Sequence, residues 1–258
     1  MKIGIIGAGN MGGAIADALI KVGGHEIIIS NRSKEKLERF AGKGINVTTD
    51  NNEATANSDL IVLAVKPWQM ESVVTTITSE VDCSSKTFVS VAAAIHGEQL
   101  CQWAGAGPQL FSAIPNTAIA HRASMTFLVP IRADEQTTIQ VKAVFDTLGN
   151  TFITDESHLF AGTALASCGI AYALSYIRAA AEGGVKLGFG AQDAKDIVMQ
   201  TMRGALSLLE PEDADVTAEI DKVTTPGGLT FRGLSAMEEA GFTKAVIQGL
   251  LASLPTDK

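Results

Sequence analysis

Cysteine and histidine are scarce in this sequence of 258 residues. The three cysteines, Cys83, Cys101 and Cys168, are widely spaced and odd in number, and the four histidines are just as scattered. No Cys-x-x-Cys motif or Cys/His cluster occurs. These absences exclude a disulfide framework and a thiolate zinc site, so we expect no metal and a reducing compartment.

Basic residues are also few: Lys and Arg number 20 against 28 Asp and Glu, which gives a net charge of -8. A net negative surface argues against broad binding to nucleic acids or anionic membranes, although a local basic pocket is compatible with it. A targeting segment is not expected either, because the opening MKIGIIGAGN has only a short apolar run before its glycines. We therefore expect a cytoplasmic protein with neither a nucleic acid nor a membrane as partner.

One long segment has no charge at all. Leu159 to Ile177 is 19 residues long, which is nearly the length of a membrane span. Its many small residues and the lack of a flanking Lys/Arg cluster favour a helix that is buried on all sides. The rest of the C-terminal region is too short to cover such a helix. The sequence therefore predicts an obligate dimer in which a second subunit covers it.

Strands and helices alternate over the first part of the chain. Apolar runs predict strands at 3–7, 26–30, 60–65, 87–91, 110–114 and 126–129. Helical spacing predicts helices at 11–22, 34–41 (with Ser33 as N-cap), 67–79, 97–103 and 134–148. Beyond Thr154 only helices are predicted, at 156–187, 191–209 and 226–254. The fold class is therefore α/β: a Rossmann domain with a doubly wound parallel sheet at 1–155, then an all-helical dimerisation domain at 156–258.

A glycine-rich turn follows the first predicted strand. Residues Gly7 to Gly12 read Gly-Ala-Gly-Asn-Met-Gly and match Gly-x-Gly-x-x-Gly between a strand and a helix, the context that gives this pattern meaning. The first glycine allows the tight turn, the second lets the backbone approach a pyrophosphate, and the third lets helix and strand pack closely. The helix N-terminus then attracts the phosphates. We expect a dinucleotide here.

The end of the second predicted strand indicates which dinucleotide is bound. An NAD-preferring site usually has Asp or Glu there, but this chain has Asn31, Arg32 and Ser33, with Lys36 nearby. These donors suit a 2′-phosphate, which an arginine can bind through two hydrogen bonds. NADP(H) is the predicted cofactor, with NAD(H) as the alternative.

Further motifs carry a family resemblance. They are the Gly-x-Gly-x-Met-Gly turn, Asn31-Arg32, Ala64-Val65-Lys66-Pro67, Val91-Ala92-Ala93, Pro115-Asn116-Thr117 and Thr225-Pro226-Gly227-Gly228-Leu229-Thr230. In this order, from residue 4 to about 245, the chain resembles pyrroline-5-carboxylate reductase, the enzyme of the last step of proline synthesis. The resemblance implies hydride transfer from NAD(P)H to the imine carbon of 1-pyrroline-5-carboxylate, which yields L-proline.

The resemblance also implies site residues. Cofactor-binding residues are Gly7, Ala8, Gly9, Asn10, Met11, Gly12, Asn31, Arg32, Ser33, Asn51, Ala64, Val65, Lys66, Pro67, Val91, Ala92 and Ala93. Substrate-binding residues are Asn116, Val223, Gly227, Gly228, Leu229 and Thr230. Lys66 follows a strand, so it would lie near the nicotinamide or its ribose. The N–H groups after Pro226 would bind the substrate carboxylate, and Thr230 would hydrogen-bond the ring nitrogen, so Lys66 and Thr230 are the catalytic candidates.

Several positions depart from the family pattern. They are Ala94, Ser112, Ala118, Leu229, Ser167, Cys168 and Ile170, whereas Gly169, Ala171 and Tyr172 match the pattern. An acidic family position corresponds loosely to Asp213. Two alternatives therefore stay open. One is a reductase of another cyclic imino acid or of a small keto or β-hydroxy acid, since Gly183-Gly184-Val185-Lys186 faintly resembles the β-hydroxyacid dehydrogenases, although Gly190 replaces their Asn. The other is a non-catalytic NADP-binding protein.

Overall fold

The structure is a computed structural model that describes residues 1–93 and 95–254. It divides into two compact units, one ending at Ser167 and the other beginning at Cys168. The sequence predicts this boundary earlier, after residue 155.

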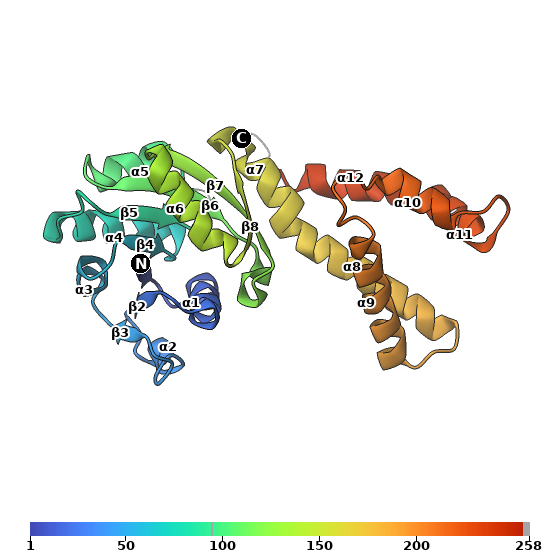
Figure 1. Ribbon diagram of the computed structural model, residues 1–258, viewed down its shortest axis with the longest axis horizontal. Helices are drawn as coiled ribbons and strands as arrows, with labels where there is room; N and C mark the ends of the chain where they lie inside the picture. The colour runs from blue at the N-terminus through green and yellow to red at the C-terminus, as the bar shows by residue number, and fades with distance from the viewer. Residues whose placement is uncertain (94, 255–258) are drawn as a thin grey trace. The chain divides into compact units, whose positions relative to one another are not determined.

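The first unit is built on one eight-stranded sheet with strand order β3-β2-β1-β4-β5-β6-β7-β8 (Figure 1). The strands are β1 Lys2–Ile6, β2 Glu26–Ser30, β3 Asn46–Thr48, β4 Leu60–Leu63, β5 Thr87–Ser90, β6 Gln109–Ile114, β7 Ser124–Arg132 and β8 Gly149–Ile153. All neighbouring pairs are parallel except β6 and β7. The predicted parallel, doubly wound sheet is confirmed in its main part.

Helices cover both faces of this sheet. They are α1 Asn10–Val22, α2 Glu35–Glu38, α3 Asn51–Ala56, α4 Pro67–Glu80, α5 Gly97–Ala104 and α6 Glu135–Asp146, with a short 3₁₀ turn, η1, at Thr117–His121. Ile3 and Ile5 of β1 share one buried cluster with residues of α1, α2 and α6. Ile6 belongs to a second cluster with residues of α3, α4 and α5. The two clusters form because successive strand side chains point to opposite faces.

Some elements differ from the prediction for physical reasons. The β6–β7 pair is antiparallel because only residues 115–123 connect the two strands, too few for a crossover. Strands β3 and β8 and helix α3 lack a clear apolar pattern and were not predicted. Ser33 was predicted as an N-cap, which is wrong: Lys34 precedes α2, and no side chain caps that helix.

The segment predicted as one helix at 156–187 is divided. It comprises a 3₁₀ turn at Glu156–His158, α7 at Leu159–Gly162, a π-helical stretch at Thr163–Cys168, and α8 at Gly169–Lys186. The second unit continues with α9 Ala191–Ser207, α10 Val216–Val223, α11 Leu229–Glu239 and α12 Phe242–Ala252. The predicted helix 226–254 is thus two helices, broken at Gly241 with a φ of 83°. Helix α10, which was not predicted, precedes them.

Within the second unit, α8 packs against α9 and α12. The hydroxyl of Tyr172 donates to Gly249 O at 3.1 Å, and the rings of Tyr176 and Phe242 meet edge to face at 6.5 Å. Even so, no residue of α8 is fully buried. The stretch Glu156–Lys186 is long and apolar enough to cross a membrane by length and composition, and only 11% of its most apolar window is buried within the chain. The sequence predicts that this apolar helix is buried on all sides, and a single chain does not bury it in that way.

Candidate cofactor and substrate sites

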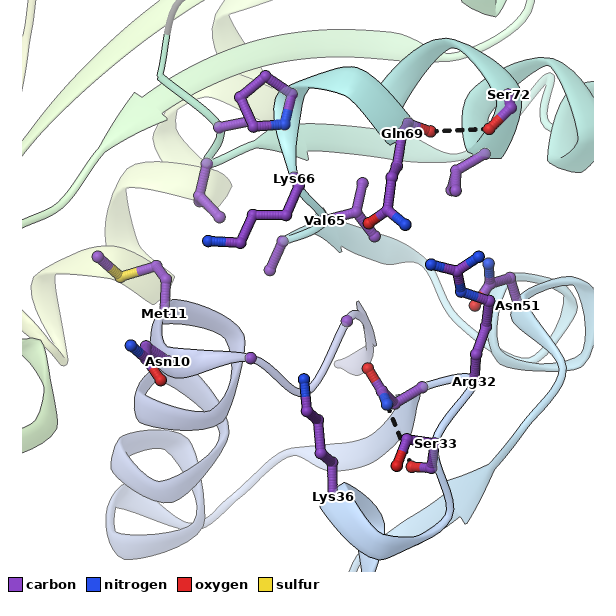
Figure 2. Close-up of a pocket in the computed structure, with 18 of the residues that line it drawn as sticks. Asn10, Met11, Arg32, Ser33, Lys36, Asn51, Val65, Lys66, Gln69 and Ser72 are labelled. Carbon is purple, nitrogen blue, oxygen red and sulfur yellow. Dashed lines mark hydrogen bonds between the residues drawn. The ribbon is translucent and has the colours of Figure 1, made fainter.

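A cavity of about 690 Å³ lies where β1, β2, β4 and β5 end (Figure 2). Its lining comprises Gly7, Gly9, Asn10, Met11, Asn31, Arg32, Ser33, Lys36, Asn51, Ala64, Val65, Lys66, Pro67, Gln69, Ser72, Val73, Thr76, Val91, Ala92 and Ala93. The structure thus brings together all the predicted cofactor residues except Ala8 and Gly12. Ligands of open α/β sheets bind at this edge, outside the carboxyl ends of the strands.

The three glycines of the turn have different surroundings. Gly7 has a φ of 109°, and a Cβ there would lie 2.7 Å from Ala64 O. A Cβ on Gly12 would lie 2.0 Å from Gly7 O, so Gly12 lets the helix approach the turn although it does not line the cavity. A Cβ on Gly9 would meet nothing within 4 Å. Because Gly9 lines the cavity, its missing side chain leaves room for a ligand rather than for the protein.

Helix α1 begins directly behind this turn. Gly9 is its N-cap, no side chain caps it, and its first turn contains no acidic residue. The first backbone N–H groups of the helix therefore lack intrahelical acceptors, and the helix dipole adds a partial positive charge at the same place. This is a suitable position for a pyrophosphate.

Two asparagines organise the β2 side of the cavity. Asn31 Oδ1 accepts a hydrogen bond from Ala8 N at 3.2 Å, and Asn31 Nδ2 donates to Ser33 O at 3.1 Å. Asn31 therefore ties the glycine turn to the end of β2, and the second N–H of its amide remains as a donor in the cavity that it lines. Asn51 Oδ1 accepts from Ser30 Oγ at 2.7 Å, which leaves the Asn51 amide N–H groups as donors.

The charge of the cavity is positive. Arg32, Lys36 and Lys66 line it, and none of its described lining residues is acidic. Figure 2 shows Arg32 and Lys36 entering from the β2 side and Lys66 extending from the opposite side towards Asn10 and Met11. Since the whole chain carries a net charge of -8, this local excess of cations indicates an anionic ligand.

Four lining residues on α4 were not predicted from the sequence. Gln69, Ser72, Val73 and Thr76 follow the Ala-Val-Lys-Pro segment at helical spacing of i, i+3, i+4 and i+7. That spacing places them on one helical face. The sequence predicts this helix at 67–79, but no motif in it indicates that this face borders the cofactor cavity.

The second unit contains the glycine turn predicted to bind a carboxylate. Gly228 N donates to Thr225 O at 2.9 Å, and Gly227 has a φ of 69°, as a type II turn with proline in its second position requires. Gly228 is the N-cap of α11, and no side chain caps that helix. The N–H groups of Leu229 and Thr230 lie in its first turn and have no intrahelical acceptor. Val223, Leu229 and Thr230 are exposed on this unit.

The side chain of Asn116 is buried and is hydrogen-bonded to backbone atoms on both sides. It is 5% exposed, its Oδ1 caps η1 by accepting from Ala118 N at 3.0 Å, and its Nδ2 donates to Ala166 O in the π-helical stretch at 3.2 Å. Asn116 does not line the cavity described above. Its side chain therefore orders the segment that carries Ser167, one of the positions that depart from the family pattern.

The other departures are spread over the chain. Ser112 is buried on β6, and Ala118 lies in η1, where its N–H bonds to Asn116. Cys168 ends the π-helical stretch, and Ile170 follows in the first turn of α8. Ala94 lies outside the described residues.

A glycine turn that enters a helix, together with a cationic cavity at the carboxyl ends of parallel strands, defines a dinucleotide-binding protein of the Rossmann class. Residues 2–94 match the family model "NADP oxidoreductase coenzyme F420-dependent", and residues 156–257 match "Pyrroline-5-carboxylate reductase dimerisation". The chain belongs to the pyrroline-5-carboxylate reductase family, which confirms the predicted resemblance and the NAD(P)-dependent oxidoreductase class.

Individual members of the family align with almost the whole length of this chain. Pyrroline-5-carboxylate reductase 3 of Danio rerio is 35% identical over 98% of this chain and 89% of its own length. Pyrroline-5-carboxylate reductase 2 of Bacillus subtilis is 31% identical over 95% and 90%. One relative from Dictyostelium discoideum is longer, and the chain spans only 48% of it at 34% identity.

Solved structures give the same result. A pyrroline carboxylate reductase of Plasmodium falciparum, solved with NADP bound, matches with a TM-score of 0.87 at 25% identity, over 98% of this chain and 95% of that one. A 1-pyrroline-5-carboxylate reductase of Streptococcus pyogenes matches with a TM-score of 0.85 at 30% identity, over 98% and 96%. The Rossmann sheet followed by helices is therefore the fold of this family.

Proposed function

We propose that this chain reduces 1-pyrroline-5-carboxylate to L-proline with NADPH as its preferred hydride donor. Membership of the family supports the reaction, and the cavity with three cations and no described acidic residue supports the cofactor. The cavity is the observation that carries the proposal. Its donors match a ligand that bears a pyrophosphate at the glycine turn and a further phosphate at the end of β2.

Three groups of cavity residues would each bind a different part of the cofactor. The N-terminus of α1 and the open space at Gly9 would hold the pyrophosphate. Arg32, Ser33 and Lys36 would hold the 2′-phosphate. Lys66 and Val91–Ala93 would border the nicotinamide end. When bound, NADPH supplies the hydride for the imine carbon, and the protein supplies orientation and charge.

Thr225–Thr230 is the proposed substrate-binding segment. The free N–H groups at the start of α11 would bind the substrate carboxylate, and Val223 would border it. The Thr230 hydroxyl would donate a hydrogen bond to the ring nitrogen, because an imine that is protonated or hydrogen-bonded accepts hydride more readily. Lys66 would add positive charge near the nicotinamide ribose.

The reaction itself provides the first test. Purified protein should oxidise NADPH when 1-pyrroline-5-carboxylate is added, with L-proline as the product and a lower rate with NADH. Tight NADPH binding without turnover on this substrate would refute the proposed reaction. It would then favour another cyclic imino acid, a keto or β-hydroxy acid, or a non-catalytic role.

Arg32→Ala is expected to weaken NADPH binding about 10- to 100-fold while NADH binding changes little. A hydrogen bond to a charged group contributes roughly 1.5–3 kcal/mol, and only NADPH carries the 2′-phosphate. Fluorescence titration of both cofactors measures the change. Lys34→Ala is the matched control, because Lys34 is an exposed cation two residues away that does not line the cavity. An equal loss for NADPH and NADH would remove Arg32 from the phosphate site.

We propose further that the protein is a homodimer through a helical domain that begins at residue 156, with larger assemblies of dimers compatible with it. The match to a dimerisation model supports this. Among the described residues from Cys168 onward, Ala194 is the only hydrophobic residue that is fully buried. A unit with so small a core is not stable alone, so a second copy is expected to cover it. The apolar stretch at 156–186 is then an interface of a cytoplasmic enzyme, which has no membrane or nucleic acid as partner.

The dimer is tested at an exposed leucine. Leu174, 59% exposed on α8, is expected to lie in the interface, so Leu174→Asp should shift the protein towards monomers in sedimentation equilibrium. Ile139→Asp is the control, since Ile139 is similarly exposed (55%) but lies on α6 of the Rossmann unit. A wild-type protein that sediments as a stable, fully folded monomer would exclude the dimer.

A further inference from the structure

One face of α4 forms a wall of the cofactor cavity and has polar and apolar parts. Gln69, Ser72 and Thr76 are its polar members, and Val73 is the apolar one. Val65, which precedes the helix, adds a second apolar side chain to the lining. A flat ligand group with apolar faces and a hydrogen-bonding edge would match such a wall.

The three polar side chains of this wall are not equally available. Ser72 Oγ donates to Gln69 O at 3.1 Å, and Thr76 Oγ1 donates to Ser72 O at 2.7 Å. Both hydroxyl protons are therefore used within the helix. The side-chain amide of Gln69 has no hydrogen-bond partner among the described residues. It offers one donor pair and one acceptor to a ligand.

The Gln69 amide points into the cavity, towards the place where Arg32 enters from the other side (Figure 2). If the pyrophosphate binds at the glycine turn and the 2′-phosphate at Arg32, the adenosine part of the cofactor extends over the end of β2. Its base then lies between the loop after β2 and the wall formed by α4. This step rests on the proposed function.

We propose that Gln69 recognises the adenine base of the cofactor. Its Oε1 accepts a hydrogen bond from the adenine 6-amino group and its Nε2 donates to N7, the pairing that glutamine amides make with adenine. Val65 and Val73 contact the face of the ring. Gln69 is thus a specificity-determining residue for the base.

The experiment compares two cofactors that differ at one group of the base. NADPH and its deamino analogue, which has hypoxanthine in place of adenine, are titrated by fluorescence into wild-type protein, Gln69→Met and Gln102→Met. Methionine matches glutamine in length and helix propensity but cannot make these hydrogen bonds. Gln102 lies exposed on α5, away from the lining of the cavity, and is the matched control.

Wild-type protein and Gln102→Met are expected to bind NADPH roughly tenfold more tightly than the deamino analogue, because the 6-oxo group cannot donate to Gln69. Gln69→Met should reduce this preference to within about twofold, mainly through weaker binding of NADPH. Equal affinities in wild-type protein, or an unchanged preference in Gln69→Met, would overturn the inference. Both are binding measurements, so they are independent of whether 1-pyrroline-5-carboxylate is the substrate.

Discussion

Gly12→Ala is expected to abolish NADPH binding and to lower the melting temperature clearly. A Cβ at this position would lie 2.0 Å from Gly7 O, a backbone atom that cannot give way without moving the turn. Overpacking of this kind costs about 1–3 kcal/mol or more, and here the distortion falls on the loop that holds the pyrophosphate. Thermal unfolding and NADPH titration measure the two effects.

Gly9→Ala is expected to weaken cofactor binding without changing the stability of the fold. Gly9 has a φ of -75°, which alanine adopts without strain, and a Cβ there meets no protein atom within 4 Å. We expect an unchanged melting temperature and at least a tenfold loss of NADPH affinity, because the methyl group occupies the place of the pyrophosphate. Unchanged NADPH affinity in Gly9→Ala would show that the pyrophosphate does not approach this turn.

Thr230→Ala is expected to lower kcat by roughly 100-fold while the Kd for NADPH stays within about twofold. A side chain that delivers a proton or a hydrogen bond to the reacting group typically contributes a factor of 10² to 10⁴. Thr230 lies in the first turn of α11, in the helical unit, whereas the cofactor cavity is lined by residues of the Rossmann unit. Cofactor affinity should therefore be spared.

The control for Thr230 is Thr217→Ala, which removes an exposed hydroxyl near the start of α10. It should leave both kcat and the NADPH Kd unchanged. If Thr230→Ala weakened NADPH binding as much as turnover, its assigned role at the ring nitrogen would be refuted. Steady-state kinetics with both substrates varied, together with a direct cofactor titration, distinguish these cases.

The Rossmann half of the chain was largely predictable because its signals are local. A glycine turn between a strand and a helix needs no knowledge of distant residues, and the segments after β1, β2, β4 and β5 meet at one edge because parallel strands end there. The residues on α4 were missed for a different reason. Their polar side chains carry no motif, and only the position of the helix next to the cavity gives Gln69 a role.

The helical half was harder to read. The break at Gly241 and the π-helical stretch before α8 interrupt segments whose composition looks continuously helical. Asn116 shows the same limit, since nothing in its motif reveals that its side chain caps η1 and bonds to Ala166. Hydrogen bonds between residues fifty positions apart leave no trace in sequence periodicity.

The small core of the helical unit makes the activity depend on protein concentration. If its helices are completed only by a second copy, the Rossmann unit can fold and bind NADPH in a single chain, whereas the part that carries Thr230 becomes ordered only on encounter. Cofactor binding would then rise in proportion to protein concentration and turnover in proportion to its square at high dilution. At a low cellular concentration, most copies of this protein would then be single chains that bind NADPH but do not catalyse the reaction.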